Sequence, residues 1–151
     1  MNDLGNTRLR SDDVRVIEFI DLKLASDQFN MNVGTEVLFV EEASSGLSVS
    51  SNRVTLKANV FYVITAGFRL NGPASGSSMG LVIRDYTNSV NLGRDCFLIS
   101  TDNPTDDGQQ PTLFFVVKPT TDIDVGFRVT TVNPANQGVF AGNTYAVIHS
   151  I

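Results

Sequence analysis

The sequence has few of the residues that an enzyme or a disulfide-stapled domain requires. Cys96 is the only cysteine, so no disulfide can form within the chain. There is no tryptophan, which argues against a sugar-binding platform built on indole rings. His149 is the only histidine, and metal sites of the cupin type need two or more histidines and a carboxylate. We therefore expect no enzymatic activity, no cofactor and no bound metal.

Clusters of positive charge are also absent. The chain carries 11 lysines and arginines against 16 acidic residues, a formal net charge of -5. Nucleic-acid backbones and anionic membranes require clustered basic side chains, so neither is an expected partner. No run approaches the ~20 apolar residues of a membrane span. Residues 1–13 are polar and lack the apolar centre of a signal peptide, so we expect a protein made and folded in a reducing cytoplasm.

The segment from Arg53 to Leu70 gives the strongest structural signal of the chain. Its second half, residues 59–70, alternates at period two, which predicts a long β-strand. Both of its faces begin with apolar residues, so both must be covered. One cover is the domain core, and the other is a second sheet, an arm or another subunit. The two faces carry Val60, Tyr62, Ile64, Ala66, Phe68 and Leu70, and Phe61, Val63 and Thr65.

Short strand patterns separated by Gly, Pro and Asn turns fill the rest of the chain. About eight to ten strands predict an all-β, antiparallel β-sandwich of the jelly-roll kind. We expect a flexible N-terminal arm at 1–13 and one domain at 14–151, with a helical turn or irregular loop at 21–31. Surface loops are expected at 71–78, 101–111 and 133–142. Other strands are expected at 14–20, 35–42, 47–51, 54–57, 79–86, 89–92, 94–100, 112–118, 121–132 and 143–151.

Five features could carry chemistry, and each also has a plain structural interpretation. His149 is either a general base or a packed or interface histidine, and it lacks a Ser/Asp arrangement. The acidic loop 101–111 is either a cation site or solvated, and it lacks the EF-hand spacing. Asp122 and Asp124 are either a catalytic pair or solvating groups on the wet face of a strand. The glycines of 71–80 lack the Gly-Lys-Ser of a phosphate loop, and Cys96 is expected to be a small buried hydrophobe.

One stretch resembles a known family. The segment LSVSSNRVTLKANVFYVITAGFRL is similar to the part of TNF/C1q-like jelly rolls in which an alternating strand leads into an aromatic-rich one. The later stretches TLFFVVK, TDIDVGFRVTTV and GNTYAVIHSI lie where that fold has its remaining strands, so the resemblance covers roughly residues 35–151. The residues that match the pattern of the first stretch are Leu56, Ala58, Tyr62, Ile64 and Ala66.

The resemblance implies a trimer that buries an apolar face around a three-fold axis. Such jelly rolls with an N-terminal arm also look like phage virion proteins, namely head decoration (cement) proteins and fibre heads. We therefore expect a virion structural protein on the capsid exterior, made in the host cytoplasm. Its partners would be further copies of the chain and a major capsid protein. The expected oligomer interface consists of Phe61, Val63, Phe114, Val116 and Tyr145, and the expected capsid-binding arm contains Arg8, Leu9 and Arg10.

A second hypothesis stays open beside the first. The chain could instead be a receptor- or glycan-binding jelly-roll module of a tail fibre or spike. Its ligand would then lie on surface loops that contain Tyr86, Asn88 and Asp102. Binding to glycans or cell envelopes without any capsid would favour this alternative.

Overall fold

A computed structural model describes residues 17–71, 76–99, 112–135 and 137–151. The proposed arm with Arg8, Leu9 and Arg10 lies outside the described residues, as do the acidic loop 101–111 and the start of the strand expected at 14–20. Nearly all regular structure in the described part is β-strand.

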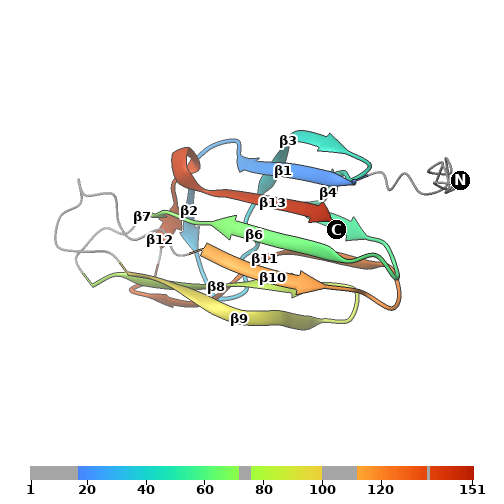
Figure 1. Ribbon diagram of the computed structural model, residues 1–151. Helices are drawn as coiled ribbons and strands as arrows, with labels where there is room; N and C mark the ends of the chain where they lie inside the picture. Colours follow the sequence, from blue (N-terminus) through green and yellow to red (C-terminus); the bar gives the residue numbers. More distant parts are fainter. Residues whose placement is uncertain (1–16, 72–75, 100–111, 136) are drawn as a thin grey trace, which may run out of the picture.

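Five antiparallel strands form the first sheet, called sheet I. Figure 1 shows its strands following one another from top to bottom, with the C-terminal strand in the middle. The strand expected at 143–151 is thus confirmed, and it lies at the centre of the sheet. In spatial order the strands are β3 (Phe39–Ser45), β1 (Phe19–Leu24), β13 (Tyr145–Ser150), β6 (Tyr62–Gly67) and β10 (Thr112–Val117).

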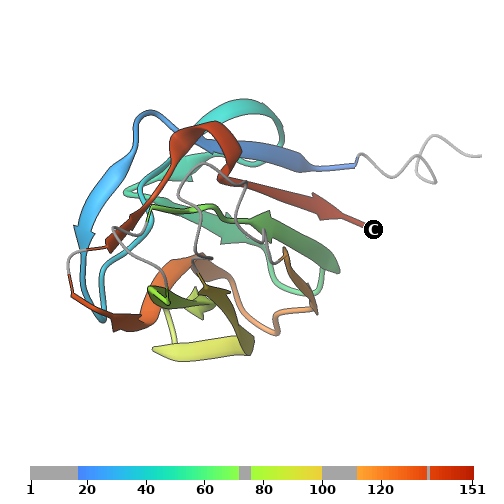
Figure 2. The ribbon, with the colours of Figure 1, turned by 90° about the vertical axis from the view of Figure 1, so that its left-hand side faces the viewer.

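A second antiparallel sheet, called sheet II, faces the first (Figure 2). A small third sheet closes one end of the sandwich. The single-turn helix η2 (Ala141–Asn143) comes directly after this sheet's last strand in the sequence. Sheet II contains, in spatial order, β4 (Val49–Ser50), β5 (Arg53–Leu56), β11 (Ile123–Asn133), β8 (Ser78–Asp85) and β9 (Val90–Ile99). The third sheet contains β2 (Gln28–Met31), β12 (Gln137–Val139) and β7 (Leu70–Asn71).

The hydrophobic core lies between sheets I and II. Strand β11 buries Ile123, Val125, Phe127 and Val129 and turns its polar residues outward, as its alternation predicts. Edge-to-face ring contacts at the centre of the core join Phe127 to Phe39 and Phe68, with centroids 5.2 and 5.7 Å apart. Cys96 is buried, which confirms its interpretation as a small hydrophobe.

Several predicted elements are confirmed. The sandwich is all-β and antiparallel, as expected, and its thirteen described strands include some of only two or three residues. The strands expected at 47–51 and 54–57 correspond to β4 and β5, which form a hairpin that turns through Ser51 and Asn52, both with positive φ. Gly46 also has a positive φ, 76°, a conformation that glycine adopts without steric cost.

Other local predictions were wrong. The segment 21–31 is mostly strand, because its residues form the end of β1 and all of β2, with only a short bend at 25–27 between them. The long strand expected at 59–70 is two strands, since β6 ends at Gly67 and β7 pairs with β12 in the third sheet. Phe68, fully buried among core aromatics, lies at this break. The separate strands expected at 89–92 and 94–100 are one strand, β9, with Gly93 at a positive φ of 74°.

Candidate interaction face

The outer face of sheet I is the main candidate site. In an antiparallel sheet, directly paired residues point to the same side. His149, Val63 and Val116 are paired across β13, β6 and β10 and therefore form one row. Val147, Thr65 and Phe114 form the next row. The residues between them, such as Tyr62, Ile64 and Ile148, are fully buried, so these rows point away from the core.

All five side chains that the sequence predicts as an interface lie on this apolar face of sheet I. Phe61 precedes β6, Val63 lies within it, Phe114 and Val116 come from β10, and Tyr145 begins β13. Phe114 is 67% exposed, and Phe61, Val116 and Tyr145 are 41–45% exposed, which is unusual for large apolar side chains gathered on three adjacent strands. Whether they contact another copy stays a prediction.

A glycine shapes this face. The ring of Tyr145 lies over Gly67, its direct partner on β6. A Cβ atom added at Gly67 would approach Cε1 of the ring to 2.5 Å, so any larger residue would displace the tyrosine. Gly67 therefore allows the aromatic ring to lie across the sheet. The sequence pattern did not reveal this role, because only the cross-strand register brings the two residues together.

A cavity of about 660 Å³ lies at one end of the apolar face. At this end β1 begins and β13 ends, on the right of Figure 1. The Lys118 ammonium lies 4.8 Å from the centre of the Phe61 ring, a cation–π contact. Sequence reasoning did not assign Ile17, Lys118 or Ile151 to any site. The lining residues are Ile17, Glu18, Asn59, Val60, Phe61, Lys118, His149, Ser150 and Ile151.

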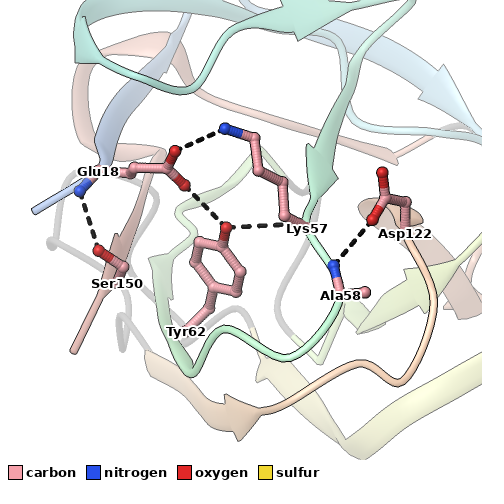
Figure 3. Close-up of polar contacts among 6 residues, drawn as sticks. All are labelled: Glu18, Lys57, Ala58, Tyr62, Asp122 and Ser150. Carbon is pink, nitrogen blue, oxygen red and sulfur yellow. Dashed lines mark hydrogen bonds and ion pairs between the residues drawn. The ribbon is translucent and has the colours of Figure 1, made fainter. Parts of the chain in front are cut away.

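A polar cluster beside the cavity ties the strands together (Figure 3). Both carboxylate oxygens of Glu18 are engaged, one with Lys57 Nζ at 2.7 Å and the other with the Tyr62 hydroxyl at 2.9 Å. The backbone N–H of Glu18 donates to Ser150 Oγ at 2.9 Å. The hydrogen bond from Lys57 is the main reason that the pKa of Glu18 is lowered. Burial, and then the hydrogen bond to Glu18, raises the pKa of Tyr62 to about 12.

These protonation states do not suit acid–base chemistry near neutral pH. Glu18 remains ionised and Tyr62 remains neutral there, since each pKa moves away from 7. The arrangement instead holds the beginning of β1 against β6 and the end of β13.

The other candidates for chemistry have structural roles. Asp122 Oδ1 accepts from the Ala58 N–H at 2.8 Å (Figure 3), and Asp124 Oδ1 accepts from the Thr55 hydroxyl at 2.7 Å. Burial raises the pKa of Cys96 to about 11, so its thiol is not an activated nucleophile. Within the described ranges, no three metal-ligating side chains gather into a group. No helix among the described residues has the length and hydrophobicity to cross a membrane.

Two loop residues of the alternative binding hypothesis, Tyr86 and Asn88, make contacts within the chain. The guanidinium carbon of Arg53 lies 3.7 Å from the centre of the Tyr86 ring, and the Tyr86 hydroxyl is buried. Asn88 donates to both carboxylate oxygens of Asp85, at 3.0 and 2.8 Å. Asp102 lies outside the described residues.

Comparison with known proteins gives a fold and no function. No protein-family model and no curated protein matches the sequence. Among solved structures, murine APRIL at pH 5.0 and at pH 8.0 superposes with TM-scores of 0.61 and 0.62, at 12% and 11% identity. Each alignment covers 90% of this chain and 100% of the other. Eiger TNF from S. frugiperda gives a TM-score of 0.50 at 9% identity, over 90% and 92% of the two chains. The chain therefore has the jelly-roll fold of TNF-family proteins, as its sequence pattern suggested.

Proposed function

We propose that this chain is a non-enzymatic structural protein that forms a homotrimer through the apolar face of sheet I. The observation that carries the proposal is the gathering of Phe61, Val63, Phe114, Val116 and Tyr145 on one outer face. Contiguous apolar patches of this kind mark interaction sites, because leaving them in water is unfavourable. A trimer is the state that the family resemblance implies.

The size of the face suits such an association. Fully burying a large apolar side chain contributes about 1.5–3 kcal/mol, and four of these five are about half exposed. Covering all five would contribute roughly 4–8 kcal/mol per copy. Association costs about 4–15 kcal/mol in lost translational and rotational freedom, so a stable oligomer needs most of the face in contact.

We further propose that the oligomer is a virion component that decorates the capsid exterior and binds across joints between shell subunits. The jelly-roll fold, together with the N-terminal arm expected from the sequence, looks like that of phage virion proteins and supports this step. An oligomer that binds several shell subunits at once gains avidity from multivalency and stabilises the shell by mass action. This role needs neither a cofactor nor a catalytic group.

Light scattering on the full chain tests self-association. We expect a mass of about 49 kDa, three times the 16.4 kDa of one chain. The double variant Phe114→Asp/Val116→Asp should give 16.4 kDa and keep a cooperative unfolding transition. Arg84→Asp on the outer face of sheet II is the matched control and should remain a trimer. A wild-type mass of one chain at protein concentrations of about 1 mg/ml and above would overturn the proposal.

Electron microscopy tests the virion assignment. Gold-labelled antibodies against the chain should mark the outside of virus particles produced in the host that expresses it. Label on cell envelopes or glycan surfaces, with unlabelled particles, would replace the decoration role with the receptor- or glycan-binding alternative. Neither result affects the test of self-association.

A further inference from the structure

The cavity at the end of the apolar face has the features of a small-molecule site. Its volume, about 660 Å³, lies within the range of roughly 300–1,000 Å³ of ligand pockets. Three large apolar side chains in its lining are well exposed, with exposed fractions of 63% for Ile17, 45% for Phe61 and 56% for Ile151. Single exposed apolar side chains are common, but three around one cavity form an apolar surface that a ligand can cover.

The formal charges around the cavity cancel. Glu18 forms an ion pair with Lys57, whose ammonium lies 2.7 Å from the carboxylate. Lys118 and the main-chain carboxylate of Ile151 belong to the same lining, and their charges are opposite in sign. The cavity therefore offers no surplus charge. An ion that entered it would lose water of hydration without gaining a counter-charge, which disfavours charged ligands of either sign.

We propose that this cavity binds an uncharged amphipathic molecule, such as a medium-chain alcohol. Its alkyl chain packs against Ile17, Phe61 and Ile151. Its hydroxyl group meets the uncharged polar part of the lining, which includes Asn59 and Ser150. The inference does not rest on the proposed trimer, because one chain supplies every lining residue.

The single histidine makes a direct assay possible. In an untagged full-length chain, the imidazole protons of His149 give one set of NMR signals from the wall of the cavity. Octanol should shift them saturably, with a dissociation constant of about 1 mM or tighter. Hexanol lacks two methylenes and should bind about 15-fold more weakly, since each buried methylene changes affinity about fourfold. Octanoate and octylammonium, which carry opposite charges on the same alkyl chain, should both bind more weakly than octanol.

Two substitutions of exposed aliphatic side chains test the apolar wall. Ile17→Ser should weaken octanol binding about tenfold, because the alcohol loses contact with about one to two methylenes' worth of apolar surface. Val33→Ser is the matched control, since Val33 is 65% exposed and does not line the cavity. Equal octanol affinity in wild type and Ile17→Ser would overturn the proposal. Linear, non-saturating shifts would do the same, as would a charged analogue that binds more tightly than octanol.

A variant of the N-terminal residues tests whether the chain itself fills the cavity. Leu4→Ser/Leu9→Ser replaces both leucines of residues 1–13 in the full chain and should leave octanol affinity unchanged. A gain in affinity of about tenfold or more would show that this segment competes for the cavity and would overturn the proposal.

The monomeric face variant keeps this test separate from the proposed function. Phe114→Asp/Val116→Asp changes no residue of the cavity and should bind octanol like the wild type. Binding that vanishes in this variant would overturn a site built by one chain and would place it between copies instead. Normal binding to a wild-type protein that proves monomeric would sustain the cavity site and refute only the trimer.

Discussion

The outer faces of sheets I and II differ in kind. Across sheet II the outward residues of β5, β11 and β8 include Arg53, Asp124, Arg128 and Arg84, with apolar exceptions Phe97 and Ile99 on the edge strand β9. Across β13, β6 and β10 of sheet I the outward residues are mostly aromatic or aliphatic, with Thr65 and His149 as the polar exceptions. A polar outer face can remain in water, whereas an apolar one favours a partner. The difference indicates which side of the sandwich makes contacts.

A second comparison is between phenylalanines of the core and those on the outer face of sheet I. Phe68→Ala should cost about 3–5 kcal/mol of unfolding free energy, because it leaves a cavity beside Phe39 and Phe127. Phe114→Ala should cost less than about 1 kcal/mol in a monomeric background, since that ring is 67% exposed. Urea unfolding of both variants measures the contrast, and similar losses would show that the outer face is packed within the copy.

The same contrast between buried and exposed side chains holds for two tyrosines, since Tyr62 on β6 is fully buried and Tyr145 on β13 is 41% exposed. Tyr62→Phe should cost about 1–2 kcal/mol at pH 7, because it removes a buried hydrogen bond to ionised Glu18. A phenol whose folded pKa is raised to about 12 disfavours folding progressively above its unfolded value near 10. The stability of the wild type should therefore fall from pH 10 to 12 more steeply than that of Tyr62→Phe. Tyr145→Phe, on the exposed face, should match the wild type in urea unfolding at pH 7.

A glycine variant should affect the face more than the fold. Gly67→Ala pushes the Tyr145 ring off the sheet and should cost about 1 kcal/mol or less in unfolding free energy. The proposed trimer of Gly67→Ala should nevertheless dissociate at protein concentrations at least tenfold higher than those at which the wild-type trimer dissociates. Sedimentation across a dilution series provides the measurement. Gly142→Ala is the control, since no atom lies within 4 Å of the added Cβ, and unchanged dissociation of Gly67→Ala would remove Tyr145 from the interface.

The smallest effect is expected on sheet II. Arg84→Gln should change the unfolding free energy by less than about 0.5 kcal/mol and leave the mass unchanged. The arginine donates to Asn91 Oδ1 at the protein surface, and glutamine can replace that donor. Chemical denaturation with light scattering on the same sample checks both quantities. A drop in mass would show that the charged face, too, contacts another copy.

The sequence predicted fold class better than strand boundaries. Alternation identified β11 with its inward residues, because one face of that strand is apolar and the other polar. The same logic failed at 59–70, where apolar residues continue through a break between two sheets. Periodicity cannot show that Phe68 leaves one sheet and lets Leu70 join another. It also missed β2, whose four residues are too short for a visible period.

The candidate face was partly predictable for the same reason. A strand apolar on both sides needs two covers, so Phe61, Val63, Phe114 and Val116 could be chosen from the predicted strands 59–70 and 112–118 by pattern alone. The cavity could not be predicted in this way. Ile17, Phe61, Lys118 and Ile151 are far apart in sequence and meet only because β1, β6, β10 and β13 are neighbours.

The sequence by itself determined the all-β class, the alternation of the strands and the presence of surplus apolar residues, because these follow from local side-chain period and composition. The tertiary structure decided which surplus residues share a face, where Gly67 accepts the Tyr145 ring and where Lys118 stands beside a cavity. Those features depend on strand order and cross-strand register. Both are fixed by pairing between distant segments, which no local pattern encodes.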